Sequence, residues 1–279
     1  MLVEIAVGDA YGAGWEFIQD DMPDKIVGYR QHPRHTGLRP GQYTDDTQMS
    51  LAIAELIIEN DDSKWTPEGI AAKFVNCFKR DPRDGYSRGF QTILESVDSG
   101  RMLLSTINGD STKNGAAMRS GPIGCLPDIQ EVMQKTALQA KVTHDSNLGI
   151  RSAVAAALMT HYFAYDLGPK DTLINFIQQY VPGNWNAWAD RVGSRDGTLA
   201  VRGAIGAIVT SKSLTEILIK TVKLGGDTDT TCAIAMAAAS MSKEVKNDVP
   251  HHLLGALENK KFGRDYLVQR DGDLMEVIR

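Results

Sequence analysis

Two short acidic segments of the sequence contain the residue types that could hold divalent metal ions. One reads TDDTQ from Thr44, and the other reads GGDTDTT from Gly225, so most of the chain separates them. Carboxylate and hydroxyl oxygens are the ligands that magnesium and manganese prefer. Two such ions, held about 3.5–4 Å apart, are neutralised by about four carboxylates, and the two segments together supply that number. The residue types therefore favour a two-metal site built from both segments.

Helix capping is the alternative interpretation of these segments. Asp45 with Gln48 three residues later forms a capping box, and acidic residues in a first helical turn are stabilised by the helix dipole. Asp227 could cap the Ala-rich helix that follows the Gly-Gly pair. A second carboxylate at Asp229 is harder to explain, because a carboxylate that enters the interior requires a partner or a metal. For the two segments together, we therefore favour metal binding over capping.

A glycine-rich helical pattern near the N-terminus leads to a third candidate, Glu16. In the segment GDAYGAGWEF, Gly8, Gly12 and Gly14 each cost about 1 kcal/mol relative to alanine in a helix, so something must come close to this backbone. That neighbour could be another helix. Glu16 stands where the helix is predicted to end and could face the site as a metal ligand or as an acid/base carboxylate.

The segment NGAAMRSGP, which begins at Asn114, is a candidate anion site. Small residues at a loop-to-helix transition leave backbone N–H groups open to a group such as a pyrophosphate. Asn-Gly is first of all a turn signal, and we expect Arg119 at the surface or in a salt bridge. The loop 84–89 and the pair Thr143-His144 are weaker candidates, since a lone histidine is usually structural or solvated.

Helical periodicity predicts the elements that must position these residues. Apolar residues recur at three- and four-residue spacing, and strand alternation over more than four residues is hard to find, so we predict an all-α fold. We expect one domain over residues 1–279, a compact multi-helix bundle with a binuclear metal site in a cleft and with the Ala-rich segments 152–160 and 231–240 at its centre. The predicted helices cover residues 45–60, 66–80, 127–141, 147–165, 171–180, 197–210, 213–224, 229–241 and 250–259.

Segments rich in Gly, Pro, Asp, Asn and Ser are predicted to be irregular, namely 17–43, 81–88, 105–113 and 181–196. The last is long for a bundle connection, and we interpret it either as a rim or lid or as a structural loop held by its aromatic residues. The first contains a basic patch between Val27 and Gln42. A solvated loop is its default interpretation, and contact with the phosphates of a ligand is the alternative. The patch consists of Arg30, His32, Arg34, His35 and Arg39.

Composition narrows the classes of partner and location. A net charge of −5 gives no basic footprint for a nucleic acid. Cys77, Cys125 and Cys232 lie far apart without a C-x-x-C motif, so neither a disulfide framework nor a zinc site is indicated. The first residues lack a positive n-region, and no run of 18 apolar residues could cross a bilayer. We therefore expect a cytoplasmic protein with no membrane or nucleic-acid partner.

Taken in order, the motifs GDAYGAGWEF, YTDDTQM, NGAAMRSGPIG, TH and GGDTDTTCAIAMAA resemble the successive signatures of the ADP-ribosylglycohydrolase family. TDDT and GGDTDT are the specific elements, and the others support them. The resemblance implies an all-α bundle with two magnesium or manganese ions at the floor of a cleft that binds ADP-ribose. It also implies hydrolysis of the C1″ glycosidic bond of an ADP-ribosyl group, on a protein side chain or a small molecule, with release of ADP-ribose.

Carried over position by position, the resemblance assigns roles to individual residues. Glu16 and Asp46 are the implied catalytic carboxylates, and Asp84 and Asp110 are further candidates for the acid/base role. The implied metal ligands are Thr44, Asp45 and Asp46 from one side and Asp227, Asp229 and Thr230 from the other. The implied substrate-binding residues are Tyr86, Asn114, Gly115, Met118, His144 and Gly226.

Two other functions remain open at this point. A two-metal phosphoesterase could use the same carboxylates, and it would release inorganic phosphate instead of ADP-ribose. A non-catalytic ADP-ribose-binding or structural protein would need no intact acidic segments, so their presence together with Glu16 argues against it. The sequence does not specify the leaving group, the resident metal or the oligomeric state.

Overall fold

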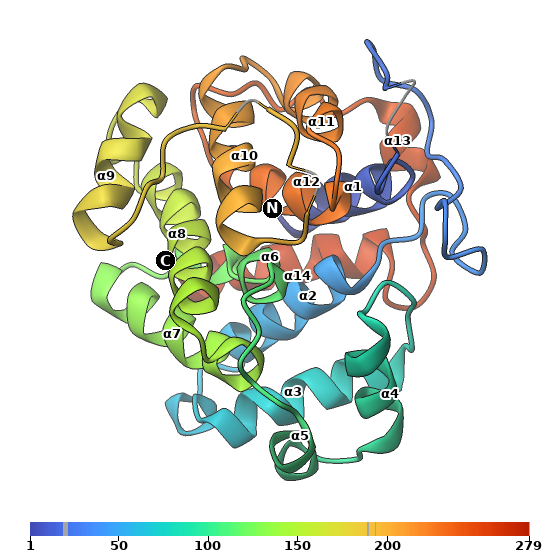
Figure 1. Ribbon diagram of the computed structural model, residues 1–279, viewed down its shortest axis with the longest axis vertical. Helices are drawn as coiled ribbons and strands as arrows, with labels where there is room; N and C mark the ends of the chain where they lie inside the picture. Colours follow the sequence, from blue (N-terminus) through green and yellow to red (C-terminus); the bar gives the residue numbers. More distant parts are fainter. Residues whose placement is uncertain (19–21, 189, 193, 279) are drawn as a thin grey trace.

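Helices form all of the regular structure in the described residues, apart from isolated β-bridges (Figure 1). The computed structural model describes residues 1–18, 22–188, 190–192 and 194–278. The predicted all-α class is confirmed. The α-helices are α1 (Leu2–Ala13), α2 (Asp45–Ile58), α3 (Pro67–Arg80), α4 (Arg88–Ser96), α5 (Gly100–Thr106), α6 (Gly115–Met118), α7 (Ile129–His144), α8 (Asn147–Ala164), α9 (Leu173–Tyr180), α10 (Gly197–Val209), α11 (Leu214–Lys223), α12 (Thr228–Ala239), α13 (His251–Ala256) and α14 (Arg264–Val277). Short 3₁₀ helices cover Asp62–Lys64, Gly121–Cys125 and Lys170–Thr172.

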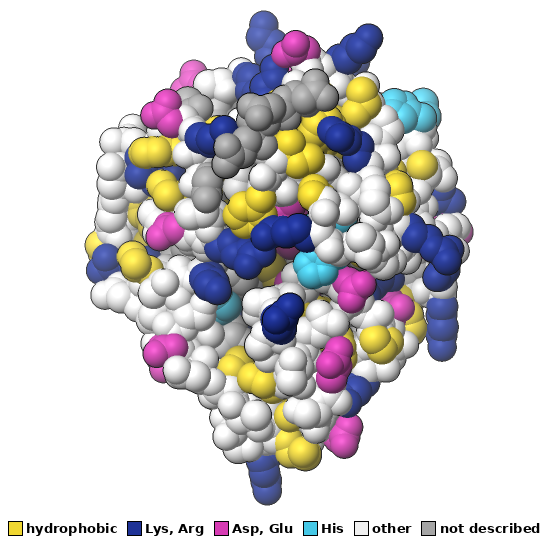
Figure 2. All heavy atoms as spheres, turned by 45° about the vertical axis from the view of Figure 1, so that its right-hand side comes forward, with side chains coloured by type: hydrophobic (Ala, Val, Ile, Leu, Met, Phe, Trp, Pro, Cys, Tyr) yellow, Lys and Arg dark blue, Asp and Glu magenta, His cyan; other side chains and the backbone are white. Residues whose placement is uncertain are grey.

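The outside of the molecule is largely polar. Charged side chains of both signs are spread over the face shown in Figure 2, and the large exposed apolar side chains, such as Met102 and Val268, lie far apart in the sequence. None of the described helices is both long and apolar enough to cross a bilayer.

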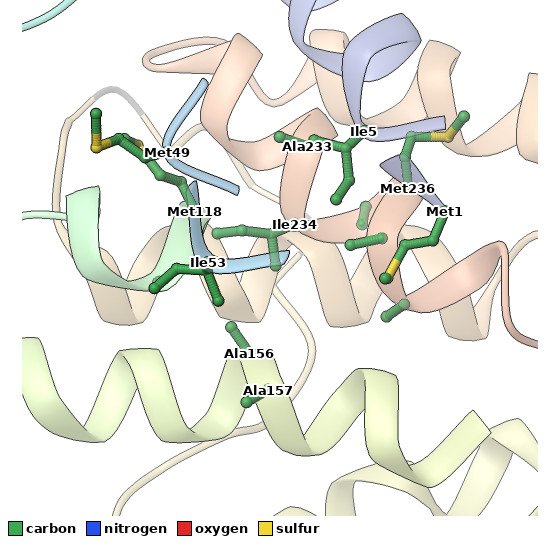
Figure 3. Packing of buried hydrophobic residues seen from close by; sticks show 14 of the residues in the cluster. Met1, Ile5, Met49, Ile53, Met118, Ala156, Ala157, Ala233, Ile234 and Met236 are labelled. Atoms are coloured by element: carbon green, nitrogen blue, oxygen red, sulfur yellow. The ribbon is translucent and has the colours of Figure 1, made fainter. Parts of the chain in front are cut away.

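Helix α12 lies at the centre of the bundle. All of its residues are buried, and it packs against α1, α8, α10 and α11. Helix α8, the other Ala-rich helix, packs against α7, α10 and α12. Figure 3 shows where side chains from different helices meet, among them Ile5 of α1, Ile53 of α2, Ala156 of α8 and Ile234 of α12. The predicted central position of the Ala-rich helices is confirmed, since alanine lets helix backbones approach closely.

The glycines of α1 mark its contact with α12, as the sequence suggested. A Cβ atom at Gly12 would lie 2.5 Å from the Cα of Asp229, and one at Gly8 would lie 3.0 Å from the carbonyl oxygen of Cys232. Neither distance leaves room for a side chain. The two glycines therefore let α1 lie directly on the helix that carries the second acidic segment.

Among the described helices, α4, α5 and α14 have no counterpart in the sequence prediction, whereas α1 and α6 lie at the helical motifs noted at Gly8 and Asn114 without being among the periodic segments. Helix α14 buries only Leu267 and Leu274, which is too narrow an apolar stripe to produce a clear pattern. Polar contacts hold it instead. Asp271 accepts a hydrogen bond from the backbone N–H of Leu2 (2.8 Å), and the hydroxyl of Tyr266 donates to Glu55 (2.7 Å).

Candidate metal centre and substrate cavity

A cavity of about 310 Å³ brings together residues from both acidic segments and from the glycine-rich motif. Its size lies at the lower end of small-molecule sites. An apolar wall faces the carboxylates and includes Phe90, Ile93, Ile107 and Met118. The carboxylates that line it are those of Glu16, Asp45, Asp46, Asp227 and Asp229, with Thr230 beside them.

A sharp reversal after α1 places Glu16 beside the second acidic segment. Phe17 has a left-handed backbone (φ 56°), and its N–H donates to the carbonyl oxygen of Gly226 (2.8 Å), which is itself left-handed (φ 74°). The hydroxyl of Thr228 donates to the carbonyl oxygen of Gly12 (2.7 Å). Gly226 therefore takes part in this junction through its backbone. It is not among the residues that line the cavity, where its predicted substrate-binding role would place it.

Asp9 fixes the start of α2 from the interior. Its carboxylate accepts hydrogen bonds from the backbone N–H groups of Thr44 (2.9 Å) and Thr47 (3.0 Å). It also accepts from the hydroxyls of the same two threonines, at 2.8 Å and 2.6 Å. Thr44 is fully buried behind the cavity, so the predicted ligand lies one layer deeper than its neighbours Asp45 and Asp46.

The structure tests the capping interpretation of the acidic segments. Elsewhere, Thr66, Asp128 and Asp196 accept a hydrogen bond at a helix start as N-caps do. The N-cap residues of α2 and α12, Thr44 and Asp227, make no such side-chain bond.

The capping box predicted for Asp45 and Gln48 is also absent. Asp45 is the first helical residue, and the amide of Gln48 donates to the carbonyl oxygens of Cys77 (3.2 Å) and Asp81 (2.7 Å). Capping therefore does not account for the carboxylates of either acidic segment.

The buried carboxylates fall into two groups that share Asp229. In each group, one ligand oxygen from every member lies within 4.8 Å of the others. The inner group comprises Asp9, Asp46 and Asp229, and the outer group comprises Glu16, Asp227 and Asp229. In the inner group, Asp46 Oδ1 is buried without a hydrogen-bond partner among the described residues, and Asp46 Oδ2 has a long contact (3.4 Å) with the hydroxyl of Thr44. A buried carboxylate oxygen with no donor fits a cation ligand.

Burial and mutual repulsion raise the carboxyl pKa values at the cavity floor. Burial is the largest cause of the pKa increase at Asp45, to about 8, with the charges of Asp9 and Asp227 adding to it. The pKa values of Asp46 and Asp229 are raised well above their usual range, again first by burial and then by neighbouring carboxylates. Such a cluster is stabilised by positive charge.

Glu16 is the exception, because positive side chains surround it. His32 Nε2 lies 2.6 Å from one carboxylate oxygen, and Arg34 (3.2 Å) and Arg195 (3.3 Å) contact the other. Burial alone would raise the pKa of Glu16, but the hydrogen bond and charge of His32 and the two arginines lower it overall. The basic patch is therefore only partly a solvated loop. Its arginines are exposed, whereas His32 is buried against the site.

Four predicted substrate-binding residues line the opposite part of the cavity, namely Asn114, Gly115, Met118 and His144. A Cβ atom at Gly115 would lie 2.9 Å from His144 Cε1, so the two residues pack directly. Burial, with the nearby charges of Arg119 and Lys113, lowers the pKa of His144 to about 3. The ring is therefore neutral near pH 7 and can accept or donate a hydrogen bond.

The prediction for Arg119 is wrong, and Tyr86, which was predicted to bind substrate, lies apart from this wall. Arg119 is neither at the surface nor in a salt bridge, because it is buried and donates to Gln139 (2.5 Å) and Thr143 (2.7 Å). Tyr86 does not line the cavity. Its hydroxyl donates to Gln48 Oε1 (2.6 Å), while Gly85 and Ser87 of the loop before α4 and Gly89 in the first turn of α4 reach the cavity.

Arg195 is the main cavity residue that the sequence alone did not single out. It lies in the segment 181–196, for which a rim and an aromatic-held loop were the alternatives, and both interpretations hold in part. Trp185 is buried and donates to the carbonyl oxygen of Val181 (2.9 Å), whereas Arg195 reaches the cavity carboxylates. Positions 189 and 193 of this segment lie outside the described residues. The positive charge of Arg195, which complements Glu16 and Asp227, was the signal that could have identified it. Using that signal required knowing that the three residues meet in the fold.

Asp84 and Asp110, the further acid/base candidates, do not line this cavity. Asp84 lines a separate groove with Arg83 and Lys260, and Asp110 forms a backbone bridge with His144. Asp46 and Glu16 are therefore the better-placed candidates for proton transfer.

The fold and the cavity define an all-α protein with a carboxylate-rich binding site, and comparison with known proteins identifies its class. The family model for ADP-ribosylglycohydrolase matches residues 1–279, so the chain belongs to the ADP-ribosylglycohydrolase family of hydrolases, as its motifs indicated. ADP-ribosyl-[dinitrogen reductase] glycohydrolase of Rhodospirillum rubrum is 28% identical over 268 residues, covering 92% of this chain and 88% of that protein.

A second relative and a solved structure agree with this assignment. ADP-ribosylhydrolase ARH3 of Xenopus tropicalis is 32% identical over 198 residues, covering 64% of this chain and 54% of that protein. A solved ADP-ribosylglycohydrolase-related protein complex has the same fold, with a TM-score of 0.75, 20% identity and coverage of 100% of this chain and 95% of the other.

Proposed function

We propose that this protein is a divalent-cation-dependent hydrolase that cleaves the C1″ glycosidic bond of an ADP-ribosyl group and releases ADP-ribose. The observation that carries the proposal is the meeting of four carboxylates, those of Glu16, Asp46, Asp227 and Asp229, at the floor of one cavity, with Asp46 Oδ1 buried and without a donor. Positive charge must balance such a cluster in a functional protein.

Two ions, Mg²⁺ or Mn²⁺, fit this donor set because all of its ligand atoms are hard oxygens. When bound, such ions supply Lewis acidity that polarises substrate oxygens and favours deprotonation of water. The residues that would hold them are Thr44, Asp45 and Asp46 from α2 and its N-cap, and Asp227, Asp229 and Thr230 from α12 and its N-cap, with Glu16 completing the outer group. The hydroxyl of Thr44 donates its hydrogen bond to Asp9, so the lone pairs of the hydroxyl oxygen are left for another partner.

The protein's own groups orient the substrate and handle the proton. A water molecule that attacks C1″ must lose a proton, and Asp46, whose carboxylate lines the cavity, is the proposed acceptor. Glu16, with its lowered pKa, stays ionised beside the outer group. Asn114, Gly115, Met118 and His144 form the wall against which the ADP-ribosyl group would lie.

The decisive assay measures free ADP-ribose released from protein ADP-ribosylated on arginine or on serine. Wild type and Asp227→Ala are compared with Mg²⁺, with Mn²⁺ and with chelator. Metal-dependent release that the variant loses supports the proposal and identifies the linkage. Release of inorganic phosphate instead would favour a phosphoesterase. No product from a folded, cation-loaded protein on either linkage or on ADP-ribosylated small molecules would indicate a binding role.

A further inference from the structure

The inner and outer carboxylate groups differ in their positive neighbours. Arg195 Nε lies 3.2 Å from Asp227 Oδ2, and Arg195 Nη2 lies 3.3 Å from Glu16 Oε1, so one guanidinium joins two members of the outer group. In the described part of the chain, no lysine, arginine or histidine is ion-paired with Asp9 or Asp46 of the inner group. Among the described residues, an incoming cation therefore meets a guanidinium at the outer group and no ion-paired positive side chain at Asp9 or Asp46.

We propose that Arg195 is a built-in competitor for the outer divalent cation. Its guanidinium occupies Glu16 and Asp227 when that ion is absent and withdraws when the ion binds, so the inner group fills first and the outer group binds its ion weakly and reversibly. This inference rests on the proposed function, because it takes the two carboxylate groups to be cation sites.

The geometry of Arg195 allows its side chain to leave while its backbone stays in place. The backbone carbonyl oxygen of Arg195 accepts a hydrogen bond from the N–H of Asn114 (3.1 Å). The next residue, Asp196, caps α10 by accepting from the N–H of Leu199 (2.9 Å). The side chain, by contrast, is 37% exposed and contacts only Glu16, Asp227 and the face of Phe17 among the described residues. Withdrawal therefore requires a change of rotamer toward solvent and no rearrangement of the fold.

The partners of Glu16 and Asp227 explain why Arg195 is the residue that competes. Glu16 is also held by His32 and Arg34, which lie on the segment before α2 and keep it ionised and in place. Asp227 has no positive partner other than Arg195 among the described residues. A divalent ion in the outer group would draw on the two carboxylates that the guanidinium contacts, and a guanidinium fixed to the chain is always present at high local concentration. The outer ion must therefore displace it.

The test measures Mn²⁺ binding to protein from which a chelator has removed all metal. Binding is measured by calorimetric titration and by the electron paramagnetic resonance signal of free Mn²⁺. We compare wild type with Arg195→Ala, Arg195→Lys and Arg202→Ala. Arg202 is the matched control, since it contacts the same connecting segment through the carbonyl oxygen of Asn186 (2.8 Å) and the ring of Trp188 but touches no cavity carboxylate. Equal melting temperatures in chelator establish that the variants are folded.

The expected result is two classes of Mn²⁺ site in wild type. In Arg195→Ala the weaker dissociation constant falls by about tenfold or more, because the charge-assisted contacts with both Glu16 and Asp227 are lost, while the tighter one is unchanged. Arg195→Lys gives a smaller fall, because an ammonium group lacks the fork that bridges two carboxylates. Arg202→Ala binds like wild type.

Two results overturn the inference in distinguishable ways. If wild type binds two Mn²⁺ ions and Arg195→Ala leaves the weaker constant unchanged or weakens it, Arg195 does not compete, although the proposed cation dependence stands. If no folded variant binds Mn²⁺, the cation part of the proposed function fails as well.

Discussion

Asp9 and Asp46 are both buried carboxylates of the inner group, yet their surroundings differ completely. Asp9 accepts four hydrogen bonds from Thr44 and Thr47, whereas Asp46 has one long contact and one oxygen with no donor. Burial raises the pKa of both. Burial and a shifted pKa therefore do not separate the structural carboxylate from the one proposed to be functional, but the number of hydrogen-bond donors does.

The largest expected effect comes from Asp46→Asn, which keeps the size of the side chain and removes its charge. We expect ADP-ribose release to fall by more than about 100-fold, since even outer partners of a metal site cost 10–100-fold when removed. Thermal unfolding in chelator should be unchanged or shifted to higher temperature, because a buried unpaired charge is lost. Release close to the wild-type rate would show that Asp46 is not part of the active site.

Asp9→Asn should have the opposite effect to Asp46→Asn, because it should lower the stability of the fold. The amide oxygen of Asn can still accept from the N–H groups of Thr44 and Thr47, which both bond to Oδ2 of Asp9. Its NH2 group, however, replaces Oδ1, so the buried hydroxyl of Thr44 loses its acceptor, at a cost of about 2 kcal/mol in the free energy of unfolding. Urea unfolding in chelator measures this, with Asp46→Asn as the matched control. A variant as stable as wild type would contradict the structural role of Asp9.

Metal removal should make stability depend on pH in a direction set by Asp45. The pKa of Asp45 rises from its ordinary value of 3.8 to about 8 in the fold, so between these values the folded state binds more protons than the unfolded state. The stability of the chelated protein should therefore be greatest at the acidic end of this window and fall as pH rises through it. Melting temperatures at both ends check this.

Two controls sharpen this pH experiment. Added Mg²⁺ should abolish the fall, and Asp46→Asn should make it shallower, because fewer carboxylates then repel one another. A melting temperature of the chelated protein that increases with pH across the window would contradict the assignment.

The smallest effect is expected for Tyr86→Phe. Its hydroxyl donates to Gln48 in the core and not to the cavity, so we expect a loss of about 1 kcal/mol in the free energy of unfolding and an unchanged KM. Asn114→Ala, on the cavity wall, should raise KM under the same conditions. A raised KM for Tyr86→Phe alone would place Tyr86 in the substrate site after all.

Much of the fold could be predicted because local patterns are strong where a helix buries a wide apolar face. Helix α3 buries Ile70, Phe74 and Phe78 at helical spacing, and its limits nearly match the predicted 66–80. Helix α14 could not be found this way, since its position depends on Asp271 and Tyr266 meeting residues from the far end of the chain. Polar contacts between distant residues leave no period in the sequence.

The sequence by itself determined the all-α class, the central Ala-rich helices, the close approach at Gly8 and Gly12, and the identity of the acidic residues that would meet. These follow from side-chain volume, periodicity and ligand chemistry, which are properties of short segments. Only the tertiary structure decided that Asp9 is satisfied while Asp46 is not, that His32 and Arg195 converge on Glu16, and that Arg119 is buried. Each of these depends on which distant groups share a small volume of low dielectric, and no local pattern encodes that.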